Sequence, residues 1–126
     1  MALSVLLVDD SKFVRKGIAK ELPTILDGKE LIFSEASNGN EALELLYVNS
    51  YDIVFLDLTM PEKTGYDVLE SLKERGIKAN IVVLTADIQP ESEKIVRSLG
   101  AIGYMEKQRP LNREALMKVL QETNIL

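Results

Sequence analysis

Five polar residues of this chain have the types and the spacing needed to hold a metal ion beside a phosphoryl group. Asp9 and Asp10, Asp57, Thr85 and Lys107 each lie at or near the end of a short apolar run. Such runs are typical of buried parallel strands, because helices cover both faces of a parallel sheet. Ligands of open parallel sheets bind just beyond the carboxyl ends of the strands. We therefore expect three carboxylates, one hydroxyl and one ammonium group to converge on one crevice, where they could bind Mg²⁺ and a phosphoryl group.

The acidic residues each have a functional and a simpler interpretation. The adjacent carboxylates of Asp9 and Asp10 repel each other, and a bound cation would remove that cost. The simpler interpretation is that one of them caps the following helix. Asp57 directly follows Leu56, and a carboxylate beside a cation can attack phosphorus to form an acyl phosphate. Its simpler role is to cap a turn.

The remaining residues offer groups that suit a phosphoryl ligand. Thr85 has a hydroxyl for a phosphoryl oxygen, and the small Ala86 leaves its backbone N–H approachable. Lys107 could pair with a carboxylate or with phosphate. An ordinary strand threonine and a solvated surface lysine are the simpler interpretations. Each signal is weak alone, but their occurrence in order at four strand ends favours a common site.

Five predicted strands alternate with segments of helical period. The second, Leu31–Ala36, is less apolar and is expected at an edge of the sheet. The other four are predicted at Val5–Val8, Ile53–Leu56, Ile81–Leu84 and Tyr104–Met105. Right-handed crossovers then give an α/β, doubly wound parallel sheet with helices on both faces and a switch point between the first and third strands.

Capping residues and breakers mark the helices. Ser11 is predicted to cap the first helix and Pro23 to end it, Pro90 suits the first turn of the fourth helix, and Asn112 caps the fifth. The apolar stripes of these helices are assigned to the core: Val14, Ile18, Leu22, Ala42, Leu45, Leu46, Val68, Leu69, Leu72, Ile95, Val96, Leu99, Leu116, Val119 and Leu120.

Composition narrows the class of protein. The 126 residues predict a single domain over 1–126, and the net charge of −5 makes nucleic acid an unsuitable partner. The chain has no Cys and no His, which excludes disulfides, thiol chemistry and a phosphohistidine within it. It has no apolar run of membrane-spanning length and no signal-peptide pattern, so we expect a cytoplasmic protein with no membrane partner.

The chain resembles a receiver domain of bacterial two-component signalling nearly end to end. The motifs that carry this resemblance are Val8-Asp9-Asp10-Ser11, Asp57-Leu-Thr-Met60-Pro61 with Gly65, Leu84-Thr85-Ala86, Gly100-Ala101 and Tyr104-Met-Glu-Lys107. The family implies a five-stranded, flavodoxin-like sheet of order 2-1-3-4-5. It also implies a response regulator that takes a phosphoryl group from a kinase phosphohistidine onto Asp57. Such a protein catalyses only its own phosphorylation and dephosphorylation, and is otherwise not an enzyme.

The resemblance also implies a ligand set. Asp10 and Asp57 would ligate Mg²⁺ directly, together with the backbone carbonyl of Thr59, and Asp9 would act through a bound water. Lys107, the hydroxyl of Thr85 and the N–H of Ala86 would then hold the phosphoryl oxygens.

The family further implies a switch. Thr85 would move towards the phosphate and Tyr104 would turn inward, which would change the face made by the fourth helix, the fifth strand and the fifth helix. A simpler role for Tyr104 is a half-buried aromatic with its hydroxyl in water. The implied partners are a histidine kinase or histidine phosphotransfer protein and a downstream target protein.

One loop departs from the family pattern. The family lysine is usually followed at once by proline, whereas here Gln108 and Arg109 separate Lys107 from Pro110. The loop is therefore expected to be about two residues longer. Lys107 could sit differently or Arg109 could share its role; we favour Lys107, because the aromatic-apolar-x-Lys pattern leads to it.

Two other function classes stay open at this point. A pseudo-receiver would bind partners without being phosphorylated. A Mg²⁺-dependent aspartyl-phosphate hydrolase typically has a second Asp two residues after the nucleophile, where this chain has Thr59. Ser11 and Arg15 favour the chemotaxis branch weakly, and a single-domain phosphorelay protein is equally open. Because no output domain follows the last predicted helix, we expect output through binding to another protein if the chain is complete.

Overall fold

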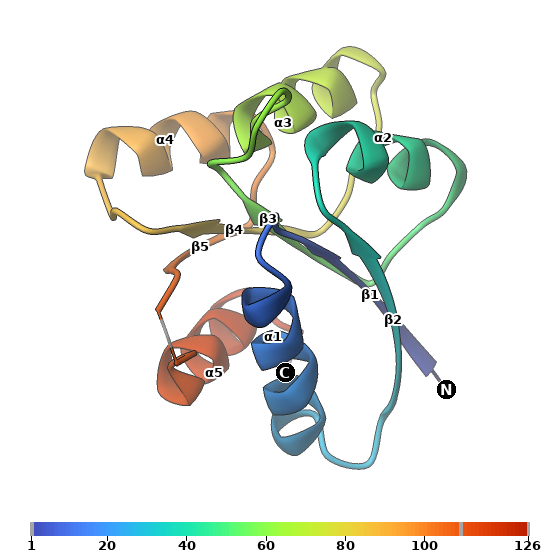
Figure 1. The fold of residues 1–126 in the computed structure, drawn as a ribbon, viewed down its shortest axis with the longest axis vertical. Coiled ribbons are helices and arrows are strands. Elements are labelled where there is room, and N and C mark those ends of the chain that lie inside the picture. Colours follow the sequence, from blue (N-terminus) through green and yellow to red (C-terminus); the bar gives the residue numbers. More distant parts are fainter. Residues whose placement is uncertain (1, 109, 126) are drawn as a thin grey trace.

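The chain folds into one parallel sheet whose strands alternate with helices (Figure 1). A computed structural model describes residues 2–108 and 110–125. All strand pairs are parallel, and the sheet order is β2-β1-β3-β4-β5, which confirms the predicted doubly wound, flavodoxin-like topology. The strands are β1 (Ala2–Val8), β2 (Glu30–Ala36), β3 (Ile53–Asp57), β4 (Ile81–Thr85) and β5 (Gly103–Glu106).

Helices cover both faces of this sheet, with α1 and α5 on one side and α2, α3 and α4 on the other (Figure 1). Each face has its own hydrophobic cluster, because successive strand residues point to opposite sides. Every residue of β3 and β4 is therefore buried, while the edge strand β2 is largely half-exposed. The helices are α1 (Lys12–Ile25), α2 (Gly39–Val48), α3 (Gly65–Glu74), α4 (Pro90–Ser98) and α5 (Arg113–Glu122).

Four of the five helices begin with a side-chain cap. The predicted caps Ser11 and Asn112 accept hydrogen bonds from Val14 N–H and Ala115 N–H, and Asn38 caps α2 in the same way. These bonds satisfy backbone donors that have no partner within the helix. No helix within residues 2–108 and 110–125 is long and apolar enough to cross a membrane.

The prediction that Pro23 ends the first helix is wrong. Helix α1 continues to Ile25, and the N–H of Leu26 still bonds to the carbonyl of Leu22 at 2.8 Å. Pro23 removes only its own hydrogen bond, to the carbonyl four residues earlier. That loss falls near the end of the helix, where burial of Leu22 and Leu26 favours one further turn.

The core assignment is also wrong in part. Ile95 is 49% exposed, whereas the half-buried Leu45 and Leu99 do pack against the core. Leu43, which lies outside the predicted stripe, is fully buried instead. Short helices at the border of a sheet bury a narrower stripe than the apolar pattern predicts, and α4 buries only Val96.

Candidate functional site

Four strand ends meet at one edge of the sheet. Asp9 directly follows β1, Asp57 and Thr85 are the last residues of β3 and β4, and Lys107 directly follows β5. Parallel register aligns these ends, since Asp57 lies opposite Leu84 in β4. The residues that sequence reasoning selected therefore come together at the carboxyl edge, as the strand order requires.

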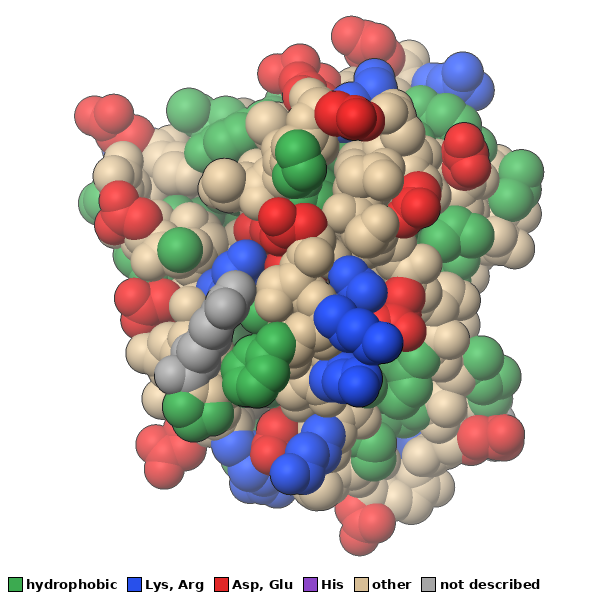
Figure 2. All heavy atoms as spheres, viewed as in Figure 1, with side chains coloured by type: hydrophobic (Ala, Val, Ile, Leu, Met, Phe, Trp, Pro, Cys, Tyr) green, Lys and Arg blue, Asp and Glu red, His purple; other side chains and the backbone are tan. Residues whose placement is uncertain are grey.

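The three acidic residues form a group that could hold a metal ion. Oxygen atoms of Asp9, Asp10 and Asp57 lie within 4.8 Å of one another. Asp9 and Asp57 are each 1% exposed, whereas Asp10 is exposed. In the space-filling view, acidic side chains gather near the end of β1, with basic side chains over α1 below them (Figure 2). The donor set is all oxygen, and oxygen donors are what hard divalent cations prefer.

Asp57 has one satisfied and one unsatisfied oxygen. Its Oδ1 accepts a hydrogen bond from the N–H of Thr59 at 3.2 Å. Its Oδ2 is buried and has no hydrogen-bond partner among the described residues. The Nζ of Lys107 lies 3.3 Å from Oδ2, close enough for an ion pair but outside hydrogen-bond geometry. A buried carboxylate oxygen in this state can accept a cation or form a new bond.

Lys107 bridges the two buried carboxylates. Its Nζ donates a hydrogen bond to Oδ2 of Asp9 at 3.1 Å. Its own N–H bonds to the carbonyl of Thr85 at 2.7 Å, which extends the β4–β5 ladder by one residue and fixes where the side chain begins. These contacts place the Lys107 side chain against the acidic group, as the sequence predicts. The alternative residue, Arg109, lies outside the described residues.

The crowding of charge shifts the proton affinities of these groups. Burial, and then the charge of Asp9, raise the pKa of Asp57 from its ordinary value of 3.8 to about 6, although Lys107 opposes the shift. Burial also raises the pKa of Asp9. Burial alone would lower the pKa of Lys107, but its hydrogen bond to Asp9 and the charges of both carboxylates raise it. A further cation would therefore stabilise the ionised carboxylates.

The hydroxyl groups of Thr85 and Tyr104 are both occupied by the loop between β4 and α4. Thr85 is 7% exposed, and its Oγ1 donates to the carbonyl of Asp87 at 3.0 Å and accepts from the N–H of Asp87 at 3.2 Å. The half-buried Tyr104 accepts a hydrogen bond from the N–H of Gln89 at 3.3 Å. This bond lies at the exposed surface, so the half-buried Tyr104 still agrees with its simpler interpretation. Ala86 and Thr59 are exposed at the same edge.

Sequence reasoning missed the structural role of one residue. Arg15 donates from Nη1 to the carbonyl of Asp9 at 2.5 Å and from Nε to Glu35 at 2.8 Å. It thereby ties the end of β1 to β2 and fixes the backbone that carries Asp9 and Asp10. Its position one turn after the cap Ser11 is the only signal in the sequence, and that signal does not specify a backbone contact.

Comparison with known proteins agrees with this geometry. The model of the response regulator receiver domain matches residues 5–121. The chain is 37% identical over 122 residues to the chemotaxis protein CheY of Halobacterium salinarum, covering 95% of this chain and 98% of that protein. It is 31% identical to the nitrate/nitrite response regulator protein NarL of Escherichia coli, over 94% of this chain but only 53% of that longer protein.

Solved structures show the same fold. The chemotaxis protein CheY4 of Vibrio cholerae superposes with a TM-score of 0.80 at 30% identity, covering 98% of this chain and 99% of the other. The NarL signal receiver domain of Mycobacterium tuberculosis gives 0.81 at 26% identity, covering 98% and 97%. On this evidence the chain belongs to the response regulator receiver domain family.

Proposed function

We propose that this chain is a phosphorylatable switch of a two-component system, acting as one domain, with Asp57 as the phosphoryl acceptor. The observation that carries the proposal is the state of the Asp57 carboxylate. It is 1% exposed, one oxygen has no hydrogen-bond partner among the described residues, and it lies close to Lys107 and to two further acids. Membership of the receiver family supports the same conclusion, because receiver domains are signalling switches rather than metabolic enzymes.

The proposed step is a phosphoryl transfer. A carboxylate oxygen of Asp57 forms a bond to phosphorus, while the bond from phosphorus to the donor breaks and the electron pair leaves with the donor. The chain has no histidine, so the donor is a phosphohistidine of a kinase or phosphotransfer protein, or a small acyl phosphate. The protein acts by positioning and electrostatics. Lys107 faces the incoming negative charge, and the N–H of Ala86 and the hydroxyl of Thr85 donate hydrogen bonds to phosphoryl oxygens.

The acidic group suits Mg²⁺, because its donors are all oxygen and one Asp57 oxygen has no hydrogen-bond partner among the described residues. In this proposal Asp10, Asp57 and the carbonyl of Thr59 would hold the ion directly, and Asp9 would act through a water. The bound ion would supply positive charge that offsets repulsion between the carboxylates and the phosphoryl group.

The switch would follow from a change of partner for Thr85. In the conformation described, its hydroxyl is occupied by Asp87, so contact with a phosphoryl group requires those bonds to break. The loop between β4 and α4, which contains Asp87, also contacts Tyr104 through Gln89. Movement of the loop would therefore change the α4-β5-α5 face, where we place the binding of the downstream target protein. A ligand shifts such an equilibrium only by its differential affinity for the two states.

Intact mass spectrometry after incubation with acetyl phosphate tests the proposal. We expect a gain of one phosphoryl group in the presence of Mg²⁺, little gain in excess chelator, and none in Asp57→Asn. If neither acetyl phosphate nor a panel of phosphorylated histidine kinases adds mass to the wild type, the switch is refuted in favour of a pseudo-receiver. Turnover of added phosphomonoesters would instead indicate the hydrolase class.

A further inference from the structure

Helix α4 is the least firmly anchored helix of the described fold. It has one buried residue, Val96, whereas each of the other helices has three or four. Its N-cap residue, Gln89, makes no side-chain capping bond among the described residues, unlike the caps of the other four. With so little burial and no cap, the position of α4 depends strongly on a few polar contacts. One is at its end, where Lys73 Nζ donates to the carbonyl of Ser98 at 3.1 Å, and the others are at its first turn.

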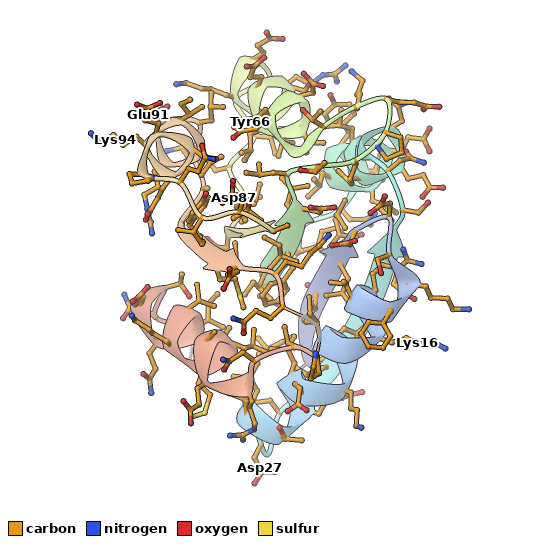
Figure 3. The ribbon with its side chains drawn as sticks, turned by 60° about the vertical axis from the view of Figure 1, so that its left-hand side comes forward. Lys16, Asp27, Tyr66, Asp87, Glu91 and Lys94 are labelled. Atoms are coloured by element: carbon orange, nitrogen blue, oxygen red, sulfur yellow. The ribbon has the colours of Figure 1, made fainter. Side chains whose placement is uncertain are left out.

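Two tyrosines hold that first turn. Tyr104 reaches it from β5, through the N–H of Gln89 at 3.3 Å. Tyr66 reaches it from α3, where its hydroxyl lies 2.6 Å from Oγ of Ser92. Figure 3 shows Tyr66 on the side of α3 that faces α4, while Glu91 and Lys94 project away from α3. Both members of the Tyr66–Ser92 bond are half-buried, so water competes for it less than at an open surface.

The backbone next to Tyr66 also contacts the end of β3, the strand that carries Asp57. The preceding residue, Gly65, donates its N–H to the carbonyl of Leu58 at 3.1 Å. A Cβ atom at Gly65 would lie only 2.5 Å from the backbone oxygen of Asp57, so the start of α3 is in tight contact with this strand end. A continuous set of contacts thus leads from Asp57 through Gly65 and Tyr66 to Ser92, without passing through Thr85 or Tyr104.

We propose that the Tyr66–Ser92 hydrogen bond is a latch that holds α4 in its unphosphorylated position and sets how readily the switch responds. Tyr66 is a positioning residue in this proposal, since it touches neither phosphoryl group nor metal ion. The conformation that shows the bond is the one in which the hydroxyl of Thr85 is turned to Asp87. Loss of the bond removes stabilisation from that state alone, so the switched state becomes more populated. This inference rests on the proposed function for its effect on signalling, but the latch itself can be measured separately.

Beryllofluoride with Mg²⁺, an analogue of a bound phosphoryl group, provides the test. Amide chemical shifts of α4 residues, followed by NMR during titration, give the apparent Kd for wild type, Tyr66→Phe and Ser92→Ala. We expect the apparent Kd to fall roughly 2- to 10-fold in either variant, which is the range set by one net hydrogen bond. The double variant is expected to gain no more than a single one, since both remove the same bond. Ser92→Thr, which keeps the hydroxyl, is expected to bind as the wild type does.

A matched control separates the latch from a general loss of stability. Tyr47→Phe removes a tyrosine hydroxyl outside the Tyr66–Ser92 contact, from a ring whose centroid lies 4.0 Å from the Arg75 guanidinium. It is expected to leave the apparent Kd unchanged. Equal Kd values in wild type, Tyr66→Phe and Ser92→Ala would overturn the latch, because the bond would then persist in both states.

Hydrogen exchange in the free protein distinguishes failure of the latch from failure of the proposed function. Amides of α4 in Tyr66→Phe are expected to exchange several-fold faster than in the wild type, with α5 unchanged. If the wild type binds no beryllofluoride, the phosphorylation proposal fails. The hydrogen exchange of α4 then decides by itself whether the Tyr66–Ser92 bond holds this helix. Unchanged exchange in α4 would overturn the latch.

Discussion

Replacement of Asp57 by Asn should stabilise the fold at neutral pH, although it removes the proposed acceptor. The pKa of Asp57 is about 6 in the fold against an ordinary value of 3.8. The folded protein therefore binds this proton more tightly than the unfolded chain does. The contribution of protonated Asp57 to the free energy of unfolding is greatest below pH 3.8 and is lost as the pH rises through about 6.

The size of the effect follows from those two values. The interval from 3.8 to about 6 corresponds to about 3 kcal/mol, which the ionised Asp57 costs the fold above pH 6. Asn has nearly the same shape and carries no charge, so the variant avoids this cost. This figure is a net cost, because the attraction to Lys107, whose Nζ lies 3.3 Å from Oδ2, already lowers the pKa of Asp57.

Urea unfolding of both proteins across pH measures the difference directly. In chelator, we expect Asp57→Asn to be more stable than the wild type by about 1–3 kcal/mol at pH 7, and the two to converge near pH 4. The control is Asp27→Asn, because Asp27 is exposed. Asp52 is less suitable, since its carboxylate accepts a hydrogen bond from the N–H of Ser4. A variant that is less stable than the wild type at pH 7, or a difference independent of pH, would refute the reasoning.

Three further predictions follow from the same contacts. Millimolar Mg²⁺ is expected to raise the Tm of the wild type and much less that of Asp10→Asn, in thermal scans with and without chelator; equal shifts in both would contradict a site at this acidic group. Lys107→Met leaves Asp9 and Asp57 buried together without their cation, and should destabilise the fold in chelator by about 3 kcal/mol, with partial recovery in Mg²⁺; an unchanged urea midpoint would count against the bridge. Gly65→Ala places a Cβ 2.5 Å from the Asp57 carbonyl oxygen and should cost about 1–3 kcal/mol by urea unfolding, and a neutral result would show that the start of α3 can move away from β3.

Most of the fold could be predicted because its strongest signals are local. Continuous apolar runs mark strands that are covered on both faces, and they set the positions of β1, β3, β4 and β5. Parallel strands also place their carboxyl ends together, so the positions of Asp57 and Thr85 follow from the topology alone. The proximity of the acidic side chains could be predicted for the same reason.

What could not be predicted depends on contacts between distant elements. The pattern of Ile95, Val96 and Leu99 gives α4 an apolar stripe, yet Ile95 is 49% exposed and α4 buries only Val96. Pro23 is a helix breaker by its chemistry, but the burial of Leu22 outweighs one lost hydrogen bond near the helix end. Arg15 and Tyr66 act through contacts with Asp9 and Ser92, and no sequence spacing encodes such pairs.

The most direct test of the proposed switch is to identify which residue carries the phosphoryl group. The protein is phosphorylated in Mg²⁺, reduced with borohydride to convert an aspartyl phosphate into homoserine, digested, and mapped by tandem mass spectrometry. We predict homoserine at Asp57 alone, in an amount that tracks the phosphoryl content before reduction. Homoserine at Asp9 or Asp10 instead, or a stable phosphoryl group elsewhere in the chain, would contradict the assignment of Asp57 as the acceptor.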